Sequence, residues 1–185
     1  KSEPKPQIDE SKPYLEFKLT YNYDVYEKPS FFLPKSQPTF AILLEEKESG
    51  TVQTIYVTGK AAEDSWILAE ERPESVPVWY GVRQKEPLAQ GEQVDAISGA
   101  TPSGDTVVIQ WQVPQWLRAK RASIFIEANS SYDYNAYYSD QKDAAGYSGA
   151  NGQPSLVWKA ELDFSKNGDE EILPEIIGHG HLWGK

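Results

Sequence analysis

The sequence contains no cysteine and no methionine, and it has only two histidines in 185 residues. Without cysteine the chain can form no disulfide, no thiolate zinc site, no iron–sulfur cluster and no thiol nucleophile. A cysteine-free chain is compatible with either redox compartment, so this absence does not indicate where the protein works. Because methionine is missing even at position 1, we expect a mature or trimmed chain.

Basic clusters and long apolar runs are missing as well. Asp and Glu number 28 against 18 Lys and Arg, which gives a net charge of −10 and repels phosphate backbones. The densest basic stretch consists of Arg118, Lys120 and Arg121 and is too short to indicate nucleic-acid binding. No apolar run approaches the roughly 18 residues of a transmembrane helix. The sequence therefore predicts neither a nucleic-acid partner nor a transmembrane segment.

The first residues, KSEPKPQIDESKP, are polar and rich in proline, lysine and serine. This composition is typical of the tether behind a removed signal peptide or a lipid-anchored cysteine, and an arbitrary boundary at a disordered end explains it equally well. We expect a flexible tether over residues 1–12 and a single domain over residues 13–185. A domain of this length buries roughly 70% of its unfolded surface and needs no metal or disulfide to hold its core.

Short runs of valine, isoleucine, threonine and tyrosine are separated by prolines and glycines, which predicts strands. The stretch KESG between two such runs predicts a hairpin with Gly50 at its turn. The only plausible helix covers residues 60–71, and the tail from Ser165 onward adds an edge strand or wraps the surface. The expected strands cover residues 14–25, 39–46, 51–59, 77–84, 105–113, 122–131 and 155–164. This pattern predicts an all-β fold, an antiparallel β-sandwich of the immunoglobulin or fibronectin type with long loops and at most one short helix.

The two histidines stand in the stretch GHGHLWG near the C-terminus. On an extended segment His179 and His181 share one face, and the glycines beside them let the backbone bend round a metal. A third ligand would have to come from an Asp or Glu that no spacing identifies, and the pair also resembles a short tag-like tail. Because both histidines lie in this tail, nothing in the sequence indicates a Ser–His–Asp triad, and we expect no enzymatic activity.

The connection over residues 132–152 is long, polar and rich in tyrosine, and loops of this length in compact domains are usually functional or mobile. Its oxygen donors suit calcium, but their spacing does not match an EF-hand, so a solvated acidic loop is the other explanation. Its tyrosines can stack on a sugar or another planar ring, or they can anchor a half-buried loop. The oxygen donors are Asp133, Asn135, Asp140, Asp143 and Asn151, and the tyrosines are Tyr132, Tyr134, Tyr137, Tyr138 and Tyr147.

The small-residue stretch VDAISGATPSGD covers residues 94–105. It contains the order D-x-x-S-G-A-T, which resembles the flavinylation motif of FMN-binding domains in the membrane sodium-pumping and Rnf-type electron-transfer complexes. This resemblance implies that a periplasmic flavin transferase attaches FMN to Thr101 through a phosphoester. Small residues let a bulky phosphate donor reach the hydroxyl, and backbone N–H groups exposed by glycine and alanine can cradle the phosphate. The implied cofactor-binding residues are Asp95, Ser98, Gly99, Ala100, Thr101 and Ser103.

We expect an inter-strand loop over residues 94–105, and turn geometry in such a loop explains the same letters without a cofactor. Asp95 and Ser98 can cap a turn through bonds to backbone N–H groups, and Gly99 can adopt a positive φ. Thr101 is extended because a proline follows it. In the FMN-binding domains the motif leads into a helix, whereas here residues 105–113 predict a strand. The resemblance therefore implies that FMN is attached to Thr101, but it implies no pocket for the isoalloxazine ring.

A wider resemblance covers roughly residues 38–165. Its segments occur in the order found in a family of predicted periplasmic proteins of unknown function, and they are PTFAILLEE, TVQTIYVTGKAA, ERPESVPVWYG, VDAISGATPSG and SIFIEAN. Members of that family are similar to small β-sandwiches, and they imply export, often in the company of membrane redox proteins. This chain replaces the family's Trp-Asp-Gly segment with QWQVPQWLRAKR and inserts the tyrosine-rich loop, and both departures alter any shared partner surface.

These patterns and resemblances predict an exported accessory domain in the periplasm or cell envelope, lipid-anchored if the N-terminal segment is a tether. Its expected role is electron transfer with covalent FMN on Thr101. Its expected partners are membrane redox proteins and a flavin transferase. The alternative is a cofactor-free module of the cell envelope that binds glycan or protein through residues 132–152.

Overall fold

The structure, a computed structural model, describes residues 8–21, 38–58, 75–85, 97–99, 106–166 and 168–180. Within these ranges strands predominate, and one α-helix accompanies them. The strands are β1 (Tyr14–Thr20), β2 (Thr39–Glu46), β3 (Val52–Thr58), β4 (Ile97–Gly99), β5 (Thr106–Gln112), β6 (Arg121–Asn129), β7 (Leu156–Asp163) and β8 (Glu175–His179). The α-helix is α2 (Pro77–Lys85), and 3-10 helices cover Gln115–Leu117 and Gly149–Asn151. The expected all-β fold with at most one short helix is confirmed for this part of the chain.

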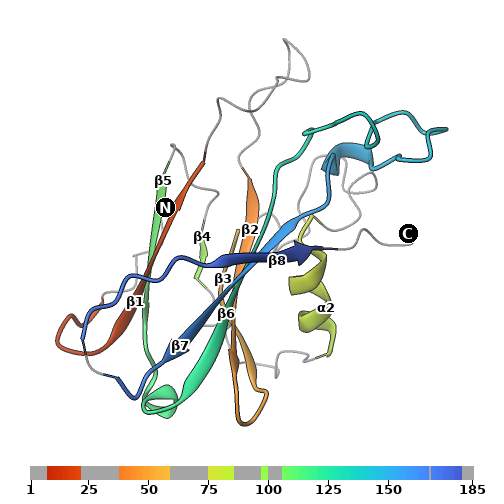
Figure 1. Ribbon diagram of the computed structural model, residues 1–185. Coiled ribbons are helices and arrows are strands. Elements are labelled where there is room, and N and C mark those ends of the chain that lie inside the picture. The colour runs from red at the N-terminus through yellow and green to blue at the C-terminus, as the bar shows by residue number, and fades with distance from the viewer. Residues whose placement is uncertain are drawn as a thin grey trace.

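The strands form two sheets that pack face to face as a sandwich (Figure 1). β1 and β5 make a two-stranded sheet, and the larger sheet has the order β4-β3-β2-β6-β7-β8. Neighbouring strands are antiparallel except for β3 and β4, which are parallel. The expected hairpin joins β2 to β3, and Gly50 adopts a φ of +68° at its turn, a conformation that disfavours a side chain.

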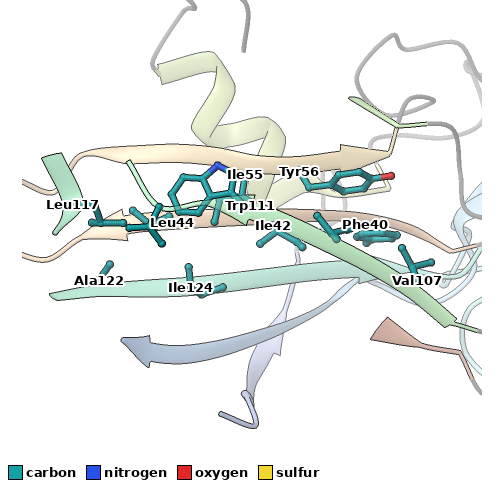
Figure 2. Packing of buried hydrophobic residues seen from close by; sticks show 12 residues of the cluster. Phe40, Ile42, Leu44, Ile55, Tyr56, Val107, Trp111, Leu117, Ala122 and Ile124 are labelled. Atoms are coloured by element: carbon teal, nitrogen blue, oxygen red, sulfur yellow. The ribbon is translucent and has the colours of Figure 1, made fainter. Parts of the chain in front are cut away.

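The main core lies between the two sheets, where alternate residues along each strand point their apolar side chains inward. On β1 the side chains of Leu15, Phe17 and Leu19 pack on this core, and the residues between them are exposed as the sequence predicts. β2 is buried on both faces, which explains its near-continuous apolar sequence. Burial of each large apolar side chain contributes about 1.5–3 kcal/mol. Figure 2 shows this cluster, which includes Phe40, Ile42, Leu44, Ile55, Tyr56, Val107, Trp111, Leu117, Ala122 and Ile124.

α2 covers the other face of the larger sheet, where Val76 and Trp79 pack in one cluster with Ala41 and Val57. The sequence predicts a strand over residues 77–84, and that prediction is wrong. The valines and aromatics of this stretch favour strands by propensity, but their spacing also fits one face of a helix, and proline suits the first helical position. Packing of these side chains on the larger sheet favours the helix over the strand. Trp79 belongs to the core, because its side chain is only 4% exposed.

The helix expected over residues 60–71 lies outside the described ranges. No helix inside them is long and apolar enough to cross a lipid bilayer. Residues 8–13 run beside the end of β5, where the Asp9 amide donates to Gln112 Oε1 at 2.9 Å. The Val113 amide donates to the Pro13 carbonyl at 3.0 Å and extends this contact.

Short strands form both edges of the larger sheet. β8 confirms that the tail adds an edge strand, and it pairs with β7 across a register shift between Val157 and Trp158. At the other edge Ile97–Gly99 pair with β3, although the sequence predicts an inter-strand loop over residues 94–105. That prediction is wrong for these three residues, because the edge of β3 offers backbone partners that satisfy their amide and carbonyl groups.

Candidate functional site

One end of the larger sheet gathers the regions that the sequence singles out. Ser98 of the motif and Gly178 of the histidine-containing tail belong to one cross-strand row that spans all six strands. The row consists of Ser98, Val57, Ala41, Glu127, Val157 and Gly178. Because β3, β4, β6 and β8 run in the same direction, they all end at this side of the sheet, which we name the loop end (Figure 1). With neighbouring strands about 4.8 Å apart, Ser98 lies roughly 14 Å from Glu127 and roughly 24 Å from Gly178 along the row.

The structure describes the D-x-x-S-G-A-T stretch only in part. The backbone of Ser98 and Gly99 forms the end of β4, and Gly99 pairs with Thr58 of the parallel strand β3. Thr58 is fully buried, and its Oγ1 has no hydrogen-bond partner among the described residues. The carboxyl ends of neighbouring parallel strands commonly lead into ligand-binding segments. The other members of the motif, Asp95, Ala100, Thr101 and Ser103, lie outside the described ranges.

The buried tryptophans of the sandwich do not form a pocket for a flavin ring. Trp79 packs on the α2 side of the larger sheet and donates from Nε1 to Thr54 Oγ1 at 3.1 Å. Trp111 packs on the opposite face, between the two sheets, and is 5% exposed. Trp79 and Trp111 therefore lie on opposite faces of the larger sheet, so these two described tryptophans do not enclose a flavin ring between them.

His179, the described member of the histidine pair, stands at the opposite edge of the same end. His179 is the last residue of β8 and is exposed, whereas His181 lies outside the described residues. Over the described ranges no group of three or more His, Asp or Glu side chains is arranged to hold a metal. The distance along the row between Gly178, next to His179, and Ser98 of the D-x-x-S-G-A-T stretch is roughly 24 Å.

Residues 132–153 form a folded loop that hydrogen-bonds within itself. The side-chain oxygen of Asn135 accepts bonds from the backbone amides of Tyr137 and Tyr138, both at 2.8 Å. Asp140 and Asp143, two of the oxygen donors that suit calcium, are exposed. The backbone of the loop is therefore held by its own side chains.

The tyrosines of this loop divide into anchors and an exposed ring. Tyr134 Oη donates to the Gly149 carbonyl at 2.8 Å, and its ring meets Tyr132 edge-on with centroids 6.4 Å apart. Tyr137 and Tyr138 also meet edge-on, at 5.0 Å, and Tyr137 is 58% exposed. The two sequence-based explanations thus apply to different residues, because Tyr134 anchors the loop and Tyr137 offers a ring to solvent.

Asp133 stands at the base of the loop in an environment that the sequence did not reveal. Its Oδ1 accepts a bond from the Gln153 amide at 2.7 Å. Burial raises the pKa of Asp133 to about 7, and the hydrogen bonds from Gln153 offset this only in part. Gly152 packs directly on the carboxyl, since a Cβ at this glycine would lie 2.1 Å from Oδ1. The sequence signal is the glycine next to a glutamine in a polar loop, which is too common to identify the contact.

Glu127 is a buried carboxyl that the sequence analysis also missed. It lies on β6, is 1% exposed, and accepts bonds from the Val78 and Trp79 amides at 3.1 and 2.8 Å, at the start of α2. Ser155 Oγ donates to it at 2.7 Å. Burial raises the pKa of Glu127, although these three bonds favour the ionised form. Strand alternation was the available signal, because it places Glu127 on the same face as the apolar Phe125.

No family model, curated protein or solved structure matches the chain. The two resemblances therefore remain predictions from the motifs quoted above. The loop end is the candidate site because it combines the described part of the D-x-x-S-G-A-T stretch with the hydrogen-bonded, tyrosine-rich loop that follows β6.

Proposed function

We propose that the protein is an extracytoplasmic electron-transfer accessory that carries FMN on Thr101. The D-x-x-S-G-A-T order carries this proposal, and the position of Ser98 and Gly99 at the carboxyl end of an edge strand supports it. Thr101 follows Gly99 by two residues, so it stays within about 7 Å of the strand end along the chain. In this proposal a modifying enzyme reaches Thr101 from the edge of the larger sheet and does not disturb the core.

Bound FMN supplies a carrier for one or two electrons. The chain itself provides the attachment point: the Thr101 hydroxyl oxygen bonds to the flavin phosphorus and loses its proton, and the leaving group of the flavin donor departs. Small residues beside Thr101 leave room for the phosphate. A flavin transferase and membrane redox proteins are the partners in this proposal, and the periplasm or cell envelope is its location.

Co-expression with a flavin transferase in an extracytoplasmic compartment tests the attachment. We expect the wild type to gain the mass of FMN less one water and to fluoresce in the gel. Thr101→Ala should gain neither, and Thr101→Ser should keep both because the hydroxyl remains. Thr106→Ala is the matched control, since Thr106 is an exposed residue of β5 outside the motif. An unmodified wild type, or full flavinylation of Thr101→Ala, overturns the proposal.

One observation favours a second candidate, a cofactor-free module of the cell envelope that binds glycan or protein. The loop over residues 132–153 is ordered by its own bonds and presents Tyr137 at 58% exposure. An aromatic ring on an ordered loop loses little conformational entropy when it binds. Such rings often dominate the energy of an interface.

Binding to a glycan array and to purified envelope proteins tests this second candidate. Tyr137→Ala should weaken binding by roughly tenfold or more, the effect typical of losing an aromatic anchor. Val108→Ala should leave binding unchanged. Val108 is also an apolar side chain that is 54% exposed, but it lies on β5, away from the loop. Equal binding by Tyr137→Ala and wild type removes this candidate.

A further inference from the structure

Large aliphatic side chains are exposed on β8 and just before it. Leu173 is 82% exposed, and Ile176 and Ile177 on the strand are 62% and 54% exposed. Single exposed apolar residues are ordinary on a protein surface, whereas a contiguous group of them commonly marks an interaction site. β8 lies at one edge of the larger sheet with β7 on its inner side, so a partner can approach it from the outer side (Figure 1).

The register shift between β7 and β8 explains how two neighbouring isoleucines come to be exposed together. Trp158 pairs with Ile176 and Val157 pairs with Gly178, which leaves Ile177 as an extra residue on β8. In a regular strand successive side chains face opposite sides of the sheet. An extra residue interrupts this alternation and re-aims the side chains around it, a device found at sheet edges and beside binding sites. A single partner at this edge can therefore contact both isoleucines.

Acidic side chains flank these apolar residues and leave the surface strongly negative. The four acids are Asp169, Glu170, Glu171 and Glu175, and all of them are exposed. Residues 167–179 contain no lysine or arginine. Lys159 pairs with Glu175 in the strand register, but its ammonium group contacts Glu161 at 2.8 Å. Among the described residues none of the four acids takes part in an ion pair, so their charge is available to a partner.

We propose that this β8 surface, made of the three exposed aliphatic residues and the four acids, docks a partner segment whose aliphatic side chains are flanked by lysine or arginine. An apolar centre with a charged rim is the usual composition of an interface. Opposite charge on the partner speeds the encounter and fixes its orientation. Because β8 is short and its edge is interrupted by the register shift, side-chain contacts carry the docking. The proposal holds whether or not Thr101 carries FMN.

The charge of the β8 surface disfavours two other occupants of its apolar residues. A second copy of the chain would bring its own four acids against these, and each copy carries a net charge of −10. An anionic lipid surface would be repelled for the same reason. Three apolar and four acidic residues are far fewer than the roughly 20–30 residues that each side of a stable interface uses. We therefore expect a weak and transient contact with a basic partner.

Titration of the isotope-labelled full chain with synthetic peptides tests the composition of this partner. One peptide alternates lysine with leucine, another alternates lysine with serine, and a third alternates glutamate with leucine. The lysine–leucine peptide should shift the amide resonances of residues 169–179 to saturation, and added salt should weaken its binding. The lysine–serine peptide should bind at least about fivefold more weakly because it offers no apolar contact. The glutamate–leucine peptide should not bind.

Substitutions of exposed side chains, which should leave the fold intact, locate the contact. Ile177→Thr should weaken binding of the lysine–leucine peptide at least about fivefold, since it removes an apolar contact. Val108→Thr is the matched control, because Val108 is also 54% exposed but lies on β5 in the other sheet. Glu171→Gln should weaken binding and reduce its dependence on salt. Glu48→Gln, exposed on the β2–β3 turn, should do neither.

Each competing explanation has its own outcome. Wild-type affinity of Ile177→Thr, equal binding of the lysine–leucine and lysine–serine peptides, or resonance shifts spread over the whole acidic chain overturn the proposal. Sedimentation of the chain alone tests the second copy, and a dimer that Ile177→Thr dissociates overturns the proposal in its favour. Binding to phosphatidylglycerol vesicles that Ile177→Thr abolishes overturns it in favour of a lipid surface.

Discussion

At the scale of single residues, close packing surrounds the Glu127 carboxyl. A Cβ at Gly180 would lie 2.0 Å from Ser155 Oγ and 2.6 Å from Glu127 Oε1. The Gly180 amide also donates to the Ser155 carbonyl at 2.8 Å. The C-terminal segment thus meets β6, β7 and the start of α2 at a point where only a glycine fits without displacing its neighbours.

Gly180→Ala should destabilise the protein by about 1–3 kcal/mol, because the added methyl group overpacks this cluster. Gly81→Ala is the matched control, since Gly81 lies in α2 with no atom within 4 Å of an added Cβ. Alanine there should stabilise the protein by about 0.5–1 kcal/mol through its higher helix propensity. Urea unfolding measures the free energy of unfolding of both variants. If both variants lose stability, or if neither does, the packing described around Gly180 is contradicted.

At the scale of elements, the β2–β3 hairpin is closed by a carboxylate. Glu46 accepts bonds from Ser49 Oγ at 2.5 Å, from the Glu48 amide at 2.8 Å and from the Ser49 amide at 3.0 Å. Lys120 Nζ approaches the same carboxylate at 3.4 Å. The bond from Ser49 Oγ is the largest of several causes that lower the pKa of Glu46 to about 2.

Because this pKa lies below the ordinary 4.5, the hairpin bonds contribute stability above about pH 4.5 and lose it as the pH falls toward 2. Glu46→Gln should be less stable than the wild type at pH 6, and the difference should shrink on acidification. Glu48→Gln, on the same turn and exposed, should follow the wild type. Thermal unfolding at pH 6, 4 and 2.5 measures this, and a constant gap between wild type and Glu46→Gln contradicts it.

Sequence patterns predict elements well where one face of a strand is buried, as on β1 with Leu15 and Phe17. They fail for α2, whose partners Ala41 and Val57 come from distant strands. They also fail for β4, because three residues are too few to show a period. Contacts made by folding alone decide these two elements.

At the scale of the whole molecule, the candidate site depends on strand order. The motif over residues 94–105 and the loop over residues 132–152 can be found in the sequence as segments. Their shared position at the loop end cannot, because it follows from the order β4-β3-β2-β6 and from the parallel pairing of β3 and β4. The burial of Glu127 and the partial burial of Asp133 escape the sequence for the same reason, since α2 binds the first and Gly152 contacts the second only in the fold.

The two edges of the larger sheet also bear on how copies of the chain behave together. Ile176 and Ile177 of β8 are 62% and 54% exposed, and a straight apolar edge of this kind invites another molecule to add a strand and start aggregation. The register shift opposite Val157 and Trp158 bends this edge, and the described part of β4 at the other edge has three residues. Within the described residues, neither edge of the larger sheet therefore gives a long, straight template for intermolecular strand pairing.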